Sequence, residues 1–173
     1  MAIILGIDPG SRITGYGLIN ATGNKLVFID CGCIKTDTAP LPERLHQIFN
    51  GLSQVIERHS PQEAAIEGVF MGRNASAALK LGQARGSAIV ACLQQNLLLE
   101  EYSARSVKQA IVGRGAAEKH QVQHMVKVLL GIKQQIQEDA ADALGVAICH
   151  AHTQAGLIKM AGAKSYSRKR LRR

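Results

Sequence analysis

The hydrophobic pattern of the first third of the chain is typical of strands. Residues 2–7 are apolar without polar alternation, which indicates a strand covered on both faces and ending at Asp8. A second short run at 17–20 and a third at 25–34 follow glycine-containing breaks. We therefore expect three antiparallel strands at the N-terminus. The breaks themselves indicate a hairpin or a backbone that passes close to a ligand, and they contain Gly10, Gly15 and Gly17.

The period becomes helical at residues 40–59, where apolar side chains recur three and four positions apart. A short apolar run then ends at Glu67, as expected for a crossover strand parallel to the first. Helical spacing returns at 76–95, where Gly82 and Gly86 lie one turn apart. Glycines at this spacing indicate either close packing against the sheet, which is the simpler alternative, or a two-fold contact between subunits.

The rest of the pattern predicts a fifth strand and three further helices, at 97–102, 105–112, 118–130 and about 139–152. Three strands followed by alternating helices and strands predict an α/β fold, a mixed five-stranded sheet flanked by helices. A chain of 173 residues with 46% hydrophobic content is long enough for one well-buried core. We expect one domain at 1–155 and a basic, flexible tail at 156–173.

The formal charge of +8 comes mostly from residues 164–173, which include lysines and arginines but no acid. Such a tail suits a polyanion such as nucleic acid, but a solvated end is equally compatible. The four cysteines lack paired spacing, so we expect them to be reduced and structural. No apolar run reaches the ~18 residues of a membrane span, and no charged leader precedes a signal-like run, so we expect a cytoplasmic protein.

Candidate chemistry lies in four carboxylates. Asp8 and Glu67 come at the ends of two strands, and Asp139 and Asp142 share one stripe of the last helix that apolar residues continue. Acids that converge without paired bases repel each other, and hard divalent cations relieve that repulsion. Mg²⁺, with Mn²⁺ as a substitute, fits better than zinc because the cysteines and histidines lack suitable grouping. Two ions about 4 Å apart would activate water and stabilise a leaving oxygen.

Each acid also has a plain structural explanation. Asp8 could cap a turn, and acids favour helix N-termini, which applies to Asp139 more than to Asp142. The residues alone leave these alternatives open.

Four segments, in order and spacing, resemble the bacterial RuvC Holliday-junction resolvases, which have the RNase H-like fold: LGIDPGSRITGYG, AIEGVFMGRNASAALKLGQARG, ARSVKQAIVGRGAAEKHQVQHMV and DAADALGVAICH. The resemblance covers about residues 2–152. It implies that Asp8, Glu67, Asp139 and Asp142 are the metal-binding catalytic positions. It also implies paired, metal-dependent nicks in four-way DNA junctions that leave 5′-phosphate and 3′-hydroxyl ends, in recombination and repair.

The same resemblance suggests DNA contacts. Lys108 and Lys119 match family lysines near the DNA backbone, although by composition alone they are ordinary surface lysines. Arg73 is a further candidate for such a contact. Phe70 follows the Glu67 strand directly, where it could be a lid on the core or a wedge against unpaired bases at a junction. Gly68 departs from the glutamine expected after the glutamate, a difference that bears on base contacts or cleavage preference.

Partners and rival functions follow from the same features. Two matched nicks require two sites, so we expect a symmetric homodimer, and the resemblance implies work alongside the RuvA and RuvB branch-migration proteins. One rival is an ATPase of the actin or sugar-kinase type, but the chain has no room for a second lobe. The other is a non-catalytic DNA-binding module, which the four intact acids argue against.

Overall fold

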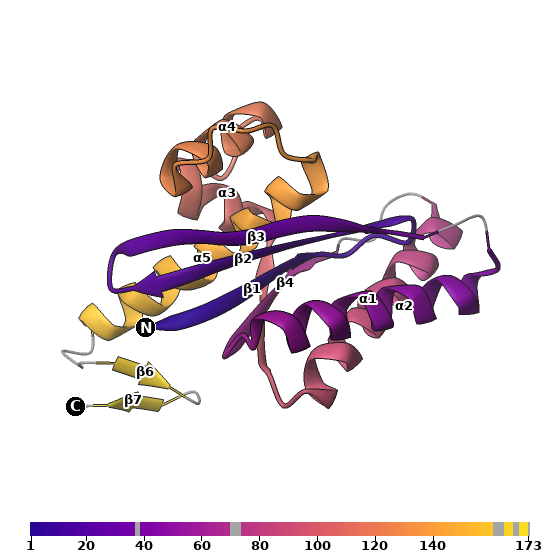
Figure 1. Ribbon diagram of the computed structural model, residues 1–173. Coiled ribbons are helices and arrows are strands. Elements are labelled where there is room, and N and C mark those ends of the chain that lie inside the picture. The colour runs from indigo at the N-terminus through magenta and orange to yellow at the C-terminus, as the bar shows by residue number, and fades with distance from the viewer. Residues whose placement is uncertain (37–38, 70–73, 161–164, 168–169, 173) are drawn as a thin grey trace.

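The computed structural model describes residues 1–36, 39–69, 74–160, 165–167 and 170–172. One sheet has the order β3-β2-β1-β4-β5, and it consists of β1 (Ala2–Asp8), β2 (Ile13–Thr22), β3 (Lys25–Lys35), β4 (Glu63–Gly68) and β5 (Leu98–Ser103) (Figure 1). The first three strands pair antiparallel, whereas β4 runs parallel to β1 and to β5. The predicted mixed five-stranded α/β sheet is therefore confirmed.

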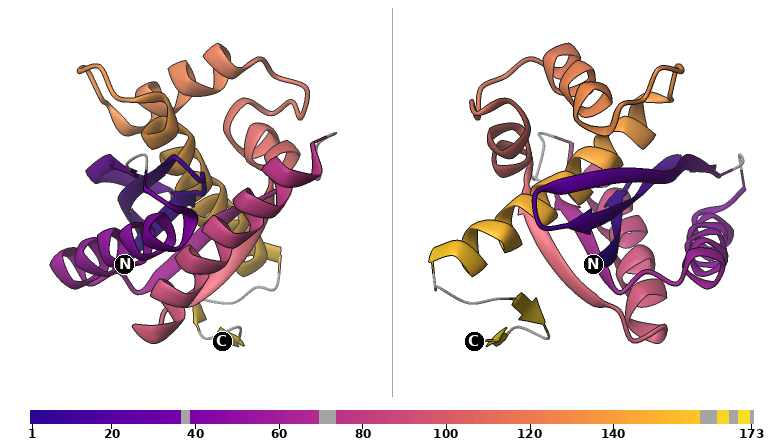
Figure 2. Two further views of the ribbon diagram at one scale, coloured as in Figure 1. Left: turned by 90° about the vertical axis from the view of Figure 1, so that its right-hand side faces the viewer. Right: turned by 60° about the vertical axis from the view of Figure 1, so that its left-hand side comes forward.

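Helices cover both faces of this sheet. They are α1 (Leu41–His59), α2 (Ala75–Gln94), α3 (Ala104–Val112), α4 (Lys119–Leu130) and α5 (Glu138–Met160). The pair α1 and α2 lies on one face, and α3, α4 and α5 lie on the other (Figures 1 and 2). Along β1, the side chains of Leu5 and Ile7 pack toward the first pair while Ile4 packs toward the second group. A strand buried on both faces explains the unbroken apolar run of residues 3–7.

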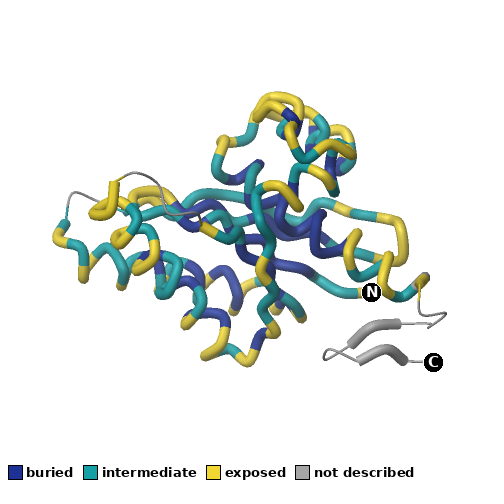
Figure 3. The backbone as a smooth tube through the Cα atoms, turned by 180° about the vertical axis from the view of Figure 1, so that it is seen from behind, coloured by how far each residue is buried: buried dark blue, intermediate teal, exposed yellow. Residues whose placement is uncertain are grey.

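Buried backbone, dark blue in Figure 3, runs through the middle of the molecule, and the sheet packs there against α5. Three glycines make this contact possible, since a Cβ atom on Gly6 would lie 2.0 Å from the carbonyl oxygen of Ala143. A Cβ on Gly17 would lie 2.7 Å from the Leu144 side chain. Gly15 and Gly17 thus lie inside β2, not in a break before it. Because they have no side chains, the backbone of α5 can pack closely against them.

The α2 glycines correct a second expectation. A Cβ on Gly82 or Gly86 would have no atom within 4 Å. The expectation that these glycines pack closely against the sheet is therefore wrong. The buried face of α2 is made by Ala84, Ala88 and Ala91 instead.

The last helix is longer than its pattern indicated. It continues to Met160, so residues 156–160 extend α5, and the strands β6 (Ser165–Ser167) and β7 (Arg170–Arg172) pair antiparallel beyond it. The division of the chain at residue 155 stays a prediction. Within the ranges that the structure describes, no helix has the length and apolarity needed to cross a membrane.

Candidate active site

Two neighbouring parallel strands bring the first two acids to one edge of the sheet. Ile7 of β1 pairs with Ile66 of β4, so Asp8 and Glu67 follow at equivalent positions. The carboxyl edge of parallel strands is where α/β folds place their ligands. Asp8 and Glu67 are therefore neighbours through the sheet register, as the sequence indicated.

The start of α5 lies against the same edge. Asp8 pairs with Gly15 across the β1–β2 ladder, and a Cβ on Gly15 would lie 2.0 Å from the carbonyl oxygen of Asp139. The missing side chain of Gly15 thus admits the first turn of α5, which contains Asp139, with Asp142 one turn further on. All four candidate acids meet in this region, and Asp8 is influenced by the charges of the other three.

The electrostatics of this edge are unfavourable to ionised acids. Burial, and then the negative charges of Glu67, Asp142 and Asp139, raise the pKa of Asp8 to about 7. Burial and the charge of Asp142 also raise the pKa of Glu67, against the opposing effect of Lys119 and Lys108. A nearby positive charge therefore stabilises the ionised form of each of these two carboxyl groups.

Lys119 supplies one such charge from the first turn of α4. Its Nζ lies 3.0 Å from Asp142 Oδ2 and also contacts the Glu138 carboxylate. Burial alone would lower the pKa of Lys119, but hydrogen bonds to Glu138 and Asp142 raise it. The turn is fixed because Gln121 Oε1 accepts a hydrogen bond of 3.1 Å from the Glu118 N–H, as in a capping box.

A pocket of about 180 Å³ opens beside these groups. Its charged lining comes from Glu67, Lys108, Lys119 and Asp142, and Ala104, Val107 and Val122 complete it. Lys108 reaches this pocket from α3, whose N-terminus is capped by Ser103 Oγ accepting from the Ser106 N–H at 3.1 Å. The two family-type lysines and two of the four acids therefore share one cavity.

The donor set suits hard cations, being carboxylate oxygens only. In the described parts of the chain, no three His, Cys, Asp or Glu side chains lie close enough together to hold a metal ion as they stand. Like charges repel at close range, and Asp142 is paired with Lys119 in this structure. The chemistry of the residues fits a hard divalent cation.

The loop that follows Asp8 is held by residues that the sequence analysis missed. Thr14 is fully buried and its hydroxyl donates to the Gly10 carbonyl at 2.9 Å. Thr36 Oγ1 donates to the Arg12 carbonyl at 3.1 Å, and the Arg44 guanidinium donates to the Ser11 carbonyl. The sequence pattern placed Thr14 in a break before the second strand, and the contacts of Thr36 and Arg44 depend on tertiary structure, so no local signal marks these three residues.

Glu138 was also missed, although its position four residues before Asp142 places both on one helix face. Two of the predicted DNA-contacting residues, Phe70 and Arg73, lie outside the described residues. Gly68 ends β4 beside Ser103, and a Cβ there would make only an ordinary contact of 3.5 Å with the Tyr102 carbonyl oxygen. The backbone at this position therefore has room for a Cβ atom.

The chain is similar over most of its length to known proteins. The family model described as Crossover junction endodeoxyribonuclease RuvC matches residues 4–150. The chain is 60% identical over 162 residues to the crossover junction endodeoxyribonuclease RuvC of Aeromonas salmonicida (strain A449). The matched residues are 94% of this chain and 94% of that protein. The chain is 59% identical over 169 residues to the protein of the same name from Photobacterium profundum, which covers 98% of each.

Among solved structures, the fold matches that of T. thermophilus RuvC in complex with Holliday junction substrate. The TM-score is 0.84 at 31% identity, over 90% of this chain and 96% of that one. The expected endodeoxyribonuclease activity is confirmed. The matches to family model, relatives and structure span nearly the whole domain, and the chain belongs to the RuvC family of crossover junction endodeoxyribonucleases.

Proposed function

We propose that Asp8, Glu67, Asp139 and Asp142 hold two Mg²⁺ ions, which Mn²⁺ can replace, and that this site nicks DNA at a four-way junction. The observation that carries the proposal is the meeting of these acids at one sheet edge, where their charges oppose the ionisation of Asp8. A divalent cation relieves that repulsion. Lys119, close to Asp142, already illustrates the demand for positive charge.

Bound ions at this edge would supply a water nucleophile of lowered pKa and stabilise the leaving oxygen. The protein's own part is to position and to bind. Lys108 and Lys119 present ammonium groups to the same pocket as Glu67 and Asp142, so a phosphate seated there is next to the carboxylates. The ends left by such a cut are a 5′-phosphate and a 3′-hydroxyl.

The substrate class is inferred from the relative solved with Holliday junction substrate, whose fold this chain shares over 90% of its length. Phe70 and Arg73, three and six positions beyond Glu67, are proposed to contact the junction, Phe70 through unpaired bases and Arg73 through a phosphate. Junctions made in recombination and repair lie on the chromosome. We therefore propose a cytoplasmic enzyme that works with the RuvA and RuvB branch-migration proteins.

We also propose a symmetric homodimer, because one domain supplies one site and resolution needs two matched nicks. The exposed face of α2 is the proposed contact. Leu79, Val90 and Leu93 are 70%, 54% and 56% exposed, and the open positions Gly82 and Gly86 lie between them. Apolar side chains in a row on a helix, with glycines that permit close approach, suit a second copy of the same helix.

The test is cleavage of a synthetic four-way junction by the purified protein in Mg²⁺ and in EDTA, beside a linear duplex of the same arm sequence. The expected result is paired nicks in the junction in Mg²⁺ only, with a 5′-phosphate at each nick. Cleavage in EDTA, or equal cleavage of the linear duplex, would contradict the proposal.

A further inference from the structure

Lys119 is shared between two carboxylates of α5 that differ in their surroundings. Asp142, one of the four proposed metal ligands, has a side chain that is 18% exposed, whereas the Glu138 side chain is 60% exposed. The two lie one helical turn apart on the same face of α5. Glu138 is thus a fifth carboxylate at the edge of the site, and its described ionic contact is with Lys119.

This arrangement has a consequence for DNA binding. Lys119 lines the pocket in which the proposed function seats a phosphate, but its ammonium already contacts two negative groups. A phosphate that takes Lys119 has to displace one of them. Glu138 is the easier one to release, because an exposed carboxylate regains most of its hydration when an ion pair opens.

We propose that Glu138 is a positioning residue that holds Lys119 in the DNA-free protein and competes with the DNA phosphate for it. The proposal rests on the proposed function, since it takes Lys119 to be a phosphate contact. Glu138 therefore weakens DNA binding. Its contact keeps the Lys119 ammonium at the site and lowers the contribution of Lys119 to junction affinity. An exposed ion pair is weak, so the reduction in junction affinity is small and a DNA phosphate can displace Glu138 from Lys119.

Lys108 provides a matched control. It lines the same pocket from α3, and no ion pair joins it to a carboxylate in the described parts of the chain. Removing the charge of Glu138 strengthens DNA binding in general, by lowering repulsion, and that general effect is the same whichever lysine is present. Only competition for Lys119 makes the effect depend on Lys119. A double-mutant cycle separates the two contributions.

The experiment measures dissociation constants for a synthetic four-way junction in EDTA, where metal-dependent cutting is blocked, by fluorescence anisotropy. Glu138→Gln is made in three backgrounds, which are the native chain, Lys108→Met and Lys119→Met. We expect Glu138→Gln to tighten binding about two- to fivefold in the native and Lys108→Met backgrounds, the range of an exposed ion pair, and less than about 1.5-fold with Lys119→Met. Glu138→Asp, which keeps the charge, should bind like the native protein.

Equal tightening in all three backgrounds, or no tightening in the native chain, would overturn the inference about Glu138. Failure of the proposed function looks different: Lys119→Met would then leave junction affinity unchanged on its own. Melting temperatures within a few degrees of the native value confirm that each variant is folded, and the exposure of Glu138 makes its substitutions tolerable.

Discussion

Asp8 faces Gly15 across the β1–β2 ladder, and this pairing determines how close α5 comes to the carboxyl edge of the sheet. The position that a Gly15 Cβ would take is 2.0 Å from the carbonyl oxygen of Asp139. Gly15, which has no side-chain chemistry, therefore helps to determine the positions of Asp139 and Asp142.

Gly15→Ala should destabilise the protein and reduce cleavage together, because the methyl group collides with backbone that cannot rotate away. The expected loss is about 1–3 kcal/mol of unfolding free energy, typical of overpacking, measured by urea denaturation. Gly156→Ala is the control, since a Cβ there meets no atom within 4 Å and alanine favours a helix. A Gly15→Ala protein as stable and active as the native one would show that α5 does not depend on this contact.

Asp8→Asn should stabilise the metal-free protein above neutral pH. The folded pKa of Asp8, about 7, is above its ordinary value of 3.8, so the unfolded chain loses this proton first and folding stability falls as pH rises between these values. At pH 8 the substitution should therefore raise the unfolding free energy, by at most about 4 kcal/mol, and should have little effect at pH 4.

Thermal melts of both proteins at these two pH values, with and without Mg²⁺, make the measurement. Mg²⁺ should raise the melting temperature of the native protein at pH 8 and that of Asp8→Asn much less. An Asp8→Asn protein that is less stable at pH 8 in EDTA would show that burial and the neighbouring acids do not oppose the charge of Asp8.

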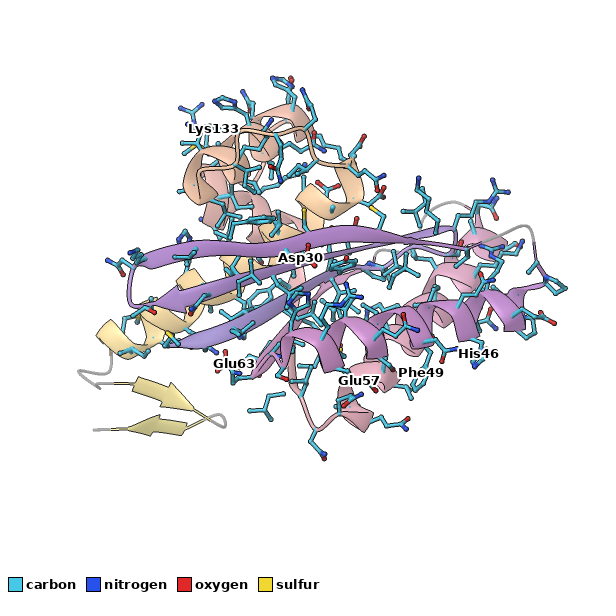
Figure 4. All side chains as sticks on the ribbon, viewed as in Figure 1. Asp30, His46, Phe49, Glu57, Glu63 and Lys133 are labelled. Atoms are coloured by element: carbon cyan, nitrogen blue, oxygen red, sulfur yellow. The ribbon has the colours of Figure 1, made fainter. Side chains whose placement is uncertain are left out.

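Glu63, labelled in Figure 4, is the first residue of β4, and its ionisation makes folding stability depend on pH in the opposite direction to that of Asp8. Burial alone would raise its pKa, but the hydrogen bonds from His150 at 2.9 Å and Gln154 at 2.6 Å lower it below the ordinary value. The stabilisation is thus complete at neutral pH and is lost as pH falls below about 4.5, through the lowered folded pKa.

Glu63→Gln should lower the free energy of unfolding by about 1–3 kcal/mol at pH 7, because it weakens a hydrogen bond to His150, which is 2% exposed. The difference from the native protein should shrink on acidification to pH 3, measured by urea denaturation. The exposed Glu43→Gln is the control and should show no such trend. A Glu63→Gln deficit that is the same at both pH values would count against an ionised Glu63.

Gly86→Leu should convert a dimer to monomers without unfolding the chain, because the position is open within one subunit and the proposed contact lies there. Analytical ultracentrifugation at micromolar concentration measures the change. Leu157→Glu, which alters an apolar side chain 44% exposed on α5, should remain dimeric. A native protein that sediments as a fully active monomer would contradict the dimer, whereas a dimeric Gly86→Leu would contradict only its location.

Much of the fold follows from local pattern. The apolar run before Asp8, the 3.6-residue period of α1 and the short run ending at Glu67 each correspond to an observed element. The ends were less predictable: nothing in the period of α5 marks Met160 as its last residue, since the helix becomes more exposed beyond Ala151. The role of Gly15 and Gly17 depends on a helix more than 120 residues away in sequence, which no local pattern contains.

The positions of the four acids were predictable, because Asp8 and Glu67 lie at strand ends and Asp139 and Asp142 lie near the start of α5. Their environment was not. The sharing of Lys119 between Asp142 and Glu138 and the contact of Arg44 with the Ser11 carbonyl join separate elements, and neither pair has a periodic signature. The close approach of the four acids was expected from the strand ends and the helix stripe, but the raised pKa of Asp8 depends on how deeply the edge is buried.

The central claim is that the four acids form one metal-dependent site. Its most direct measurement is the single-turnover cleavage rate in Mg²⁺, together with junction affinity in EDTA, for Asp8→Asn, Glu67→Gln, Asp139→Asn and Asp142→Asn. The account predicts that each substitution lowers the rate by at least about 100-fold while junction affinity stays near the native value or increases, because negative charge beside a phosphate is removed. A substitution that leaves the Mg²⁺-dependent rate unchanged would contradict the account and remove that residue from the site.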